Sequence, residues 1–270
     1  MSVRRLVRGT VPWEQLEAVG RELRDRYDQE TVRLVFFEAD NWLSTPCVVN
    51  DRWFVKIISP QNALVHALFT GARNLGAFSS GTEGFFERFE SPVEMAQHEL
   101  EATRRMREIG LNAPEPVEAF QVEELGVLVL SYLADFRSLD DLSADEIRGV
   151  LPDLFAALAT LHENDLAHGD LRGENVLIHD GEVYFIDATA VSEQGIDEAR
   201  SYDLASALAV LEPTVGAHVA VEEAVAVYGT EPVLQAVDFL DFVNIRPDHD
   251  FDAAAVKGEV TKVASESTTE

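Results

Sequence analysis

Three polar side chains, Asp170, Asn175 and Asp187, are spaced as if a loop and a short hairpin carried them. Asp170 follows a predicted long helix, Asn175 directly precedes a short apolar strand, and Asp187 ends a second apolar strand. A turn at Asp180–Gly181 should pair these two strands and bring Asn175 close to Asp187. Phosphoryl transfer needs such groups: a carboxylate that accepts the proton of a hydroxyl, and oxygen ligands for Mg²⁺ on the phosphates.

Each of these residues also has a purely structural interpretation. Aspartate and asparagine are common in turns, and Gly169 and Gly173 would mark turns in any loop. The combined spacing is harder to explain in this way, because it places a carboxylate, an amide and a second carboxylate around one predicted hairpin. The pattern therefore favours a phosphoryl-transfer site.

The segment 168–178 (HGDLRGENVLI), followed by 183–189 (VYFIDAT), resembles the catalytic loop and metal-binding segment of the protein-kinase-like superfamily. The His-Gly-Asp form resembles the atypical RIO-like kinases and the small archaeal kinase of the KEOPS complex. Aminoglycoside and choline kinases share this form. The similarity spans roughly residues 32–212 and is strong only in this loop. It implies an α+β, two-lobed protein-kinase-like fold and a function that depends on ATP and Mg²⁺.

The resemblance also implies roles for individual residues. Asp170 would be the catalytic base, and Asn175 and Asp187 would bind Mg²⁺. His168 would brace the loop. Arg172 could neutralise phosphate charge, or it could be one of many surface arginines, and the sequence favours neither.

Lys56 is the second anchor of the expected site. It lies within an apolar strand and is the first of three lysines in the chain, the others being Lys257 and Lys262. A buried cation without a partner is costly, so pairing or function is implied, although a lysine on an edge strand could also reach solvent. In the resembled family a lysine at this place holds the α- and β-phosphates and pairs with a helical glutamate. We expect Glu99, which shares a helix face with Met106 and Ile109.

Asp203 is expected at the start of a helix, where it could cap the helix or favour its dipole. The resembled family has an aspartate at the matching place that braces the backbone of the catalytic loop. Both interpretations are structural.

Two departures from the kinase pattern are evident. The turn expected to cover the nucleotide phosphates, residues 39–45, has no glycine; Ser44 and Thr45 could donate to phosphate, whereas Asp40 would repel it. Fifteen residues separate Asp187 from Asp203, which is too short for the activation segment that holds peptide substrates. The chain is therefore expected to be an atypical kinase.

The periodicity of apolar residues predicts a β-rich first lobe and a helical second lobe that meet near residues 131–136. The predicted domains are a nucleotide-binding lobe at 1–133 with an insert at 59–91, a reduced helical lobe at 134–247, and a disordered acidic tail at 248–270. Helices are expected at 14–28, 92–109, 143–164, 203–211, 219–228 and 232–243. Strands are expected at 31–38, 46–50, 52–58, 117–122, 127–133, 176–178 and 183–186.

Three functions remain open. The first is an atypical serine/threonine protein kinase or ATPase of RIO/KEOPS-like type, whose partners are ATP and an unknown protein or small-molecule acceptor. The second is a small-molecule phosphotransferase, which usually has a larger helical lobe than the residues after Asp203 provide. The third is a pseudokinase that serves as a binding module, which the altered phosphate loop favours and the retained polar residues oppose.

The charge of the chain is strongly acidic: 49 aspartate and glutamate residues against 21 lysine and arginine residues give a net charge of −28. Such a surface keeps a protein soluble at high ionic strength, where salt screens the repulsion. Scarce lysine together with this charge favours a protein of a halophilic cytoplasm over an ordinary acidic protein, and the resemblance to the archaeal kinase implies an archaeal source. The charge argues against direct nucleic-acid binding.

No membrane partner is expected, because no apolar run is long enough to span a bilayer. One cysteine excludes an internal disulfide.

Overall fold

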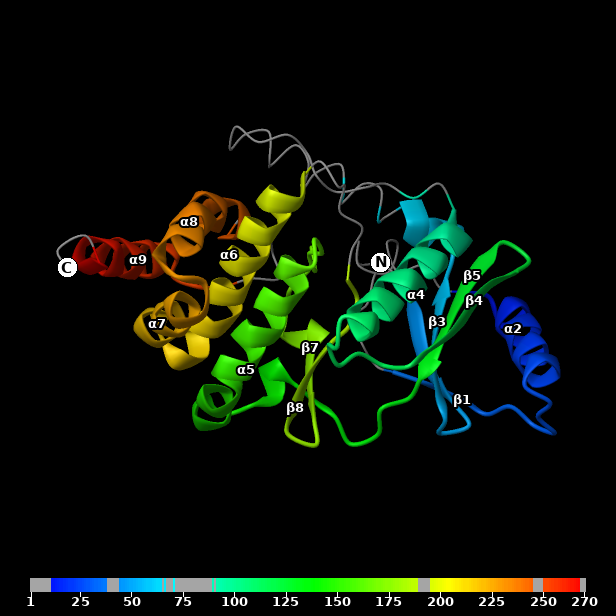
Figure 1. Ribbon diagram of the computed structural model, residues 1–270. Helices are drawn as coiled ribbons and strands as arrows, with labels where there is room; N and C mark the ends of the chain where they lie inside the picture. Colours follow the sequence, from blue (N-terminus) through cyan, green and yellow to red (C-terminus); the bar gives the residue numbers. More distant parts are fainter. Residues whose placement is uncertain are drawn as a thin grey trace, which may run out of the picture. The chain divides into compact units, whose positions relative to one another are not determined.

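The computed structural model describes residues 11–37, 44–64, 66, 70, 89, 91–188, 195–244 and 250–267. The described residues form two compact units. The first contains those up to Thr70, those from 89 to 105, and Pro114–Ala134; the second contains Met106–Ala113 and those from Asp135 onward. The first unit is built around a sheet that helices flank, and helices dominate the second (Figure 1). The predicted α+β class is confirmed.

The first unit is built on a five-stranded antiparallel sheet in the order β1-β2-β3-β5-β4. The strands are β1 (Leu34–Phe36), β2 (Thr45–Val49), β3 (Trp53–Ile58), β4 (Pro116–Val122) and β5 (Leu125–Ser131). β2 and β3 are joined by the predicted tight turn at Asn50 and Asp51, both of which have a φ of 52°. Asparagine and aspartate tolerate this left-handed conformation better than most residues do.

Two helices, α2 (Trp13–Arg26) and α4 (Pro92–Glu108), cover the sheet of the first unit (Figure 1). Val19 and Leu23 of α2 pack in one apolar cluster with the alternate strand residues Val55 and Ile57. A second cluster joins α4 to the opposite face of the sheet; it contains Met95, Ala96, Leu100, Ile58, Leu128 and Leu130. Because successive strand residues point to opposite faces, the two helices lie on the two sides of the sheet.

The second unit begins with a short three-stranded sheet and a long helix. The sheet has the order β6-β7-β8, with β6 (Arg137–Ser138), β7 (Val176–His179) and β8 (Glu182–Phe185). The 3₁₀ turn η1 (Leu139–Asp141) precedes the long helix, and a second 3₁₀ turn, η2 (Gly173–Asn175), follows the loop that carries Asp170. The helix α5 (Ala144–Glu163) starts at a capping box between Ser143 and Glu146, as the sequence predicts.

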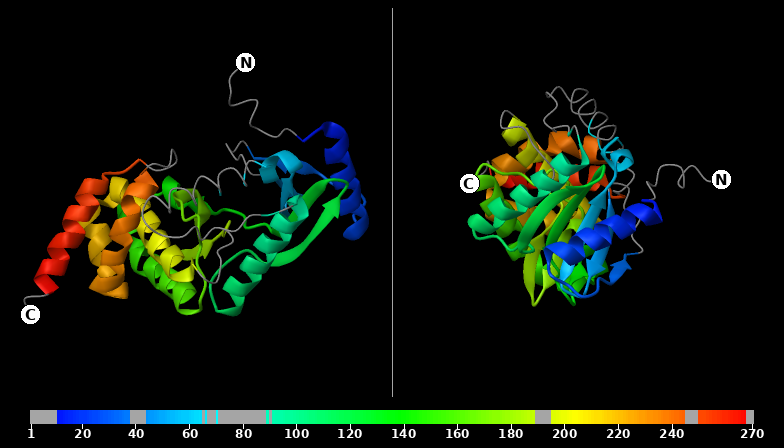
Figure 2. Two further views of the ribbon diagram at one scale, coloured as in Figure 1. Left: turned by 90° about the horizontal axis from the view of Figure 1, so that it is seen from above. Right: turned by 90° about the vertical axis from the view of Figure 1, so that its right-hand side faces the viewer.

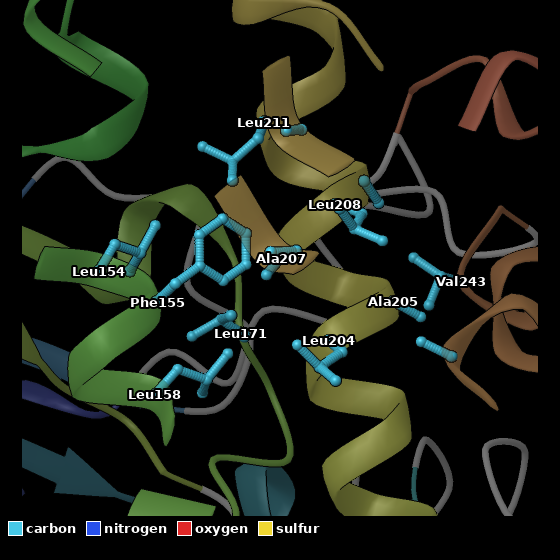
Figure 3. Close-up of a cluster of buried hydrophobic side chains, with 14 of the residues drawn as sticks. Leu154, Phe155, Leu158, Leu171, Leu204, Ala205, Ala207, Leu208, Leu211 and Val243 are labelled. Carbon is cyan, nitrogen blue, oxygen red and sulfur yellow. The ribbon is translucent and has the colours of Figure 1, made fainter. Parts of the chain in front are cut away.

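Four further helices complete the second unit: α6 (Ile196–Val215), α7 (Ala217–Tyr228), α8 (Thr230–Asn244) and α9 (Ala253–Ser267). The core of this unit is formed by buried residues of all five helices from α5 to α9, among them Phe155, Leu204 and Val243 (Figure 3). The last helix, α9, lies beside α8 (Figure 2, left). Within the described residues, no helix is long and apolar enough to span a bilayer.

Two predictions about this part of the chain are wrong. The segment 248–270 is not a disordered tail: α9 occupies most of it, because Val256 and Val260 recur every four residues and are buried in the core. The helix expected to start at Asp203 starts at Ile196, and Asp197 and Glu198 favour its first turn. Most of the insert at 59–91 and the expected phosphate loop at 39–43 lie outside the described residues.

Candidate active site

Lys56 lies on β3 with its side chain 6% exposed, and its Nζ is 2.8 Å from Oε1 of Glu99 on α4. β3 is an inner strand between β2 and β5, where Lys56 is opposite Pro46 and Leu128. These neighbours supply no charge, so the cation needs a partner from outside the sheet. Glu99, the glutamate expected to pair with Lys56, is therefore the residue found beside it.

Ser44 and Thr45 lie at the start of β2 in the same unit. Thr45 pairs with Ile57, close to Lys56 in the sheet. Ser44 is buried, and its Oγ has no hydrogen-bond partner among the described residues. A buried hydroxyl that lacks a partner is unfavourable, and it is a free donor for a ligand.

The loop that carries Asp170 belongs to the second unit and joins α5 to η2. Asp170 is 4% exposed, and Oδ2 of its carboxylate lies 3.1 Å from the guanidinium of Arg172, which also pairs with Glu174. Arg172 is therefore partly buried and ion-paired beside the expected base. A guanidinium in this position offers positive charge next to the carboxylate.

Glycine at two places lets the loop adopt this conformation. Gly169 has a φ of 75°, in the left-handed region that side chains disfavour. Glycine is needed at position 173 for a different reason, because a Cβ at this position would lie 1.8 Å from Oδ1 of Asp140. Asp140 in η1 thus approaches the loop closely, and burial raises the pKa of its carboxyl, as does the nearby Asp141, while Arg172 lowers it. The sequence reasoning did not identify Asp140.

His168 braces the loop through both ring nitrogens. Its Nδ1 lies 3.3 Å from the amide nitrogen of Asp170, and its Nε2 lies 2.9 Å from the carbonyl oxygen of Ile186. An amide N–H donates and a carbonyl accepts, so Nδ1 is the acceptor and Nε2 carries the proton. Burial lowers the pKa of His168, which keeps the ring neutral, as this pattern requires. The predicted structural role agrees with these contacts.

Asp203 holds the backbone of the same loop. It lies within α6 and is fully buried, and its carboxylate accepts hydrogen bonds from the amides of His168 (2.6 Å) and Gly169 (2.8 Å). The prediction that it caps a helix is wrong, because α6 starts seven residues earlier, at Ile196. The bracing contact that the resemblance implies is present.

Two residues that the sequence reasoning missed extend this network. Nε2 of His162 on α5 lies 3.2 Å from Oδ2 of Asp203, and the hydroxyl of Tyr228 on α7 lies 3.0 Å from Nδ1 of His162. His162 follows Leu158 by four residues on the buried stripe of α5, and a polar residue in that position was a usable signal. Tyr228 is 66 residues further along the chain and left no such signal.

Asn175 and Asp187 are brought close together by the β7–β8 hairpin. The amide of Ile186 donates to the carbonyl of Asn175 over 3.1 Å, and Asp187 is the next residue. Asn175 is buried, and its Nδ2 donates to the carbonyl of Asp170 over 2.8 Å, which leaves its amide oxygen as the atom for a cation. Asp187 has a φ of 62°, an unfavourable conformation that is frequent at functional sites.

These donors fit Mg²⁺. An amide oxygen and a carboxylate are hard ligands, and Mg²⁺ is usually held by one or two protein groups together with substrate phosphates. Within the part of the chain that the structure describes, no three histidine, cysteine or acidic side chains gather to hold a metal by themselves. These two donors would need further ligands, such as phosphate oxygens, to complete a Mg²⁺ site.

The chain is similar to known proteins over part of its length. A family model described as the RIO domain matches residues 87–202. The KEOPS complex subunit Bud32 of Pyrococcus abyssi (strain GE5 / Orsay) is 30% identical over 115 residues, which is 41% of this chain and 51% of that protein. The chain thus matches about half the length of this relative.

Two solved structures resemble the chain at 12% sequence identity. A point mutant of the Mycobacterium tuberculosis PknI kinase domain has a TM-score of 0.43, with 87% of this chain and 95% of that chain covered. The Drosophila melanogaster PAN3 pseudokinase has a TM-score of 0.41, with 88% of this chain and 64% of that chain covered.

Proposed function

We propose that the chain, which is similar to the RIO domain over residues 87–202 and to the KEOPS complex subunit Bud32 over 115 residues, is an ATP-dependent phosphotransferase or ATPase that uses Mg²⁺. The observation that carries this proposal is the braced loop of the second unit. Asp203 and His168 hold its backbone, Asp170 is presented beside Arg172, and Asn175 is fixed through Asp170. Such fixed geometry is what phosphoryl transfer requires of a protein.

The residues of the second unit have distinct roles in this proposal. Asp170 orients the hydroxyl of the acceptor and takes its proton. Asn175 and Asp187 would hold Mg²⁺, which neutralises phosphate charge when it is bound. Arg172 adds positive charge beside Asp170.

The first unit contributes the groups that bind phosphate. Lys56, kept in place by Glu99, offers its ammonium to the α- and β-phosphates of the nucleotide. Ser44 and Thr45 donate hydrogen bonds to phosphate oxygens, in place of the backbone amides of a glycine-rich loop. The free Oγ of Ser44 supports this role.

The acceptor is proposed to be a serine, either of a partner protein or of the chain itself, with water as the acceptor in an ATPase. The relative from Pyrococcus abyssi is named as a subunit of the KEOPS complex. A protein partner for this chain is proposed on that basis. Transfer to a small molecule is the second outcome that an acceptor screen can give.

The test is turnover of MgATP by the wild-type chain and by Asp170→Asn, at both low and about 2 M KCl. We expect Asp170→Asn to lower turnover at least about 100-fold, since a general base contributes about that much, and to leave nucleotide affinity within about threefold. Asp180→Asn is the matched control: Asp180 is an exposed turn residue with a φ of 52°, which asparagine also tolerates, and its variant should keep full turnover.

One result would overturn the proposed enzyme activity. If the wild-type chain binds MgATP tightly and turns over none, with or without acceptors, the chain is a nucleotide-binding module.

A further inference from the structure

A chain of hydrogen bonds leads from the last residue of α7 to the backbone of the catalytic loop. The hydroxyl of Tyr228 contacts Nδ1 of His162, Nε2 of His162 contacts Asp203, and the carboxylate of Asp203 accepts from the amides of His168 and Gly169. The next residue is Asp170. All of these residues belong to the second unit.

The direction of each hydrogen bond follows from what each group can donate. The carboxylate of Asp203 only accepts, so Nε2 of His162 must carry a proton. In a neutral imidazole Nδ1 is then an acceptor, and the hydroxyl of Tyr228 is its donor. Burial raises the pKa of Tyr228, as does the charge of Asp203, so this hydroxyl keeps its proton. For a neutral imidazole, the network therefore has one consistent arrangement of protons.

Without the hydroxyl, Nδ1 of His162 loses its donor, and of the two contacts only the carboxylate of Asp203 still favours the proton on Nε2. Either nitrogen of a neutral imidazole can carry the proton, and a proton on Nδ1 would turn the lone pair of Nε2 toward the carboxylate of Asp203. Asp203 is fully buried, and a buried carboxylate that loses one donor and faces a lone pair is destabilised. Its two bonds to the loop amides would then weaken or shift.

We propose that Tyr228 is a positioning residue of the proposed reaction: its hydroxyl, together with the carboxylate of Asp203, fixes the Nε2–H tautomer of His162, and through Asp203 it fixes the backbone that presents Asp170. Tyr228 lies outside residues 87–202, which match the RIO domain, so this contact comes from the chain's own C-terminal helices. The effect on turnover rests on the proposed function, whereas the effect on the tautomer does not.

The decisive variant is Tyr228→Phe, which keeps the ring that packs on His162 and removes only the hydroxyl. We expect ¹⁵N NMR of the imidazoles to show the Nε2–H tautomer of His162 in the wild type and a mixture of tautomers in the variant. We expect kcat to fall about fivefold or more, as for the loss of one hydrogen bond, with the KM for ATP unchanged.

Two comparisons separate positioning from a general loss of stability. Tyr27→Phe is the matched control, because the hydroxyl of Tyr27 also makes one hydrogen bond, to Glu118 over 2.8 Å, but in the first unit. It should leave kcat and the tautomer of His162 unchanged. In a His162→Asn background, Tyr228→Phe should cause no further loss of kcat, since the hydroxyl acts only through the imidazole.

The possible outcomes are distinguishable. An unchanged tautomer of His162 in Tyr228→Phe overturns the inference, and so does a changed tautomer with an unchanged kcat. If the wild-type chain has no turnover, the proposed function fails, and the inference is then judged by the tautomer and by the amide proton shift of Gly169. That shift should move in Tyr228→Phe and stay in place in Tyr27→Phe.

Discussion

At the scale of single residues, the ion pair between Lys56 and Glu99 combines stability with proposed function. Lys56→Met should destabilise the chain by about 3 kcal/mol, because Glu99 keeps a charge that is only 15% exposed and loses this partner. The double variant Lys56→Met/Glu99→Gln should recover most of that loss, since no charge of the pair then remains. Chemical denaturation measures both values.

The affinity for MgATP should not follow the stability of the chain in this series of variants. Both variants lack the ammonium that is proposed to bind phosphate, so we expect MgATP affinity to fall at least about tenfold in each. The control is Lys257→Met, which removes a partly exposed lysine paired with Asp241 over 2.6 Å and should change neither quantity much. Unchanged nucleotide affinity in the double variant would show that Lys56 is a structural residue.

The residues of this pair were predictable because each signal was local. Lys56 stands in an apolar strand and Glu99 shares a helix face with Met106, and the resemblance to kinases implied that a lysine and a glutamate at these places pair. The contacts of Tyr228 and Asp140 were not predictable in this way. Both depend on how distant elements pack, and neither hydropathy nor spacing records which atom lies against a given side chain.

At the scale of elements, the backbone of β5 closely approaches the start of α4 in the first unit. A Cβ at Gly126 would lie 2.1 Å from the carbonyl oxygen of Pro92, and backbone atoms cannot yield as a flexible side chain can. Gly126→Ala should therefore destabilise the chain by about 2 kcal/mol or more. Because α4 carries Glu99, a shift of this helix should also weaken MgATP binding.

The matched control for this substitution is Gly149→Ala on α5. A Cβ there meets no atom within 4 Å, and alanine favours a helix over glycine by up to about 1 kcal/mol. Its Tm should rise while that of Gly126→Ala falls, as calorimetry can show. If both variants behave alike, the contact between β5 and α4 is looser than the structure indicates.

Elements with local signals were the ones that the sequence predicted well. The capping box at Ser143, the turn at Asn50–Asp51 and the β7–β8 hairpin each depend on a few adjacent residues. The helix α9 was missed because the prediction rested on the polar and acidic character of the whole segment 248–270, although the helix itself has two lysines and two glutamates. What makes it a helix is the burial of Val256 and Val260 against the other helices, which is a tertiary effect.

At the scale of the whole molecule, the net charge of −28 is the dominant property. Each positive side chain can pair with few acids, as Lys257 does with Asp241 and Lys262 with Glu259, so most acidic groups remain uncompensated. Repulsion among them opposes the compact state. The screening length is about 10 Å at 0.1 M salt and about 3 Å at 1 M, so salt removes much of that repulsion.

We therefore expect the Tm to rise steadily as KCl increases from about 0.1 M to about 2 M. An uncharged osmolyte at equal osmolality is the control, because it strengthens burial without screening charge and should give a smaller rise. A second comparison uses a variant in which several exposed acids, such as Glu108, Asp153 and Asp238, become asparagine or glutamine. Its Tm should be higher at low salt and should depend less on KCl, since fewer like charges remain to be screened. A wild-type Tm that is insensitive to KCl would mean that the acidic side chains lie too far apart to oppose folding.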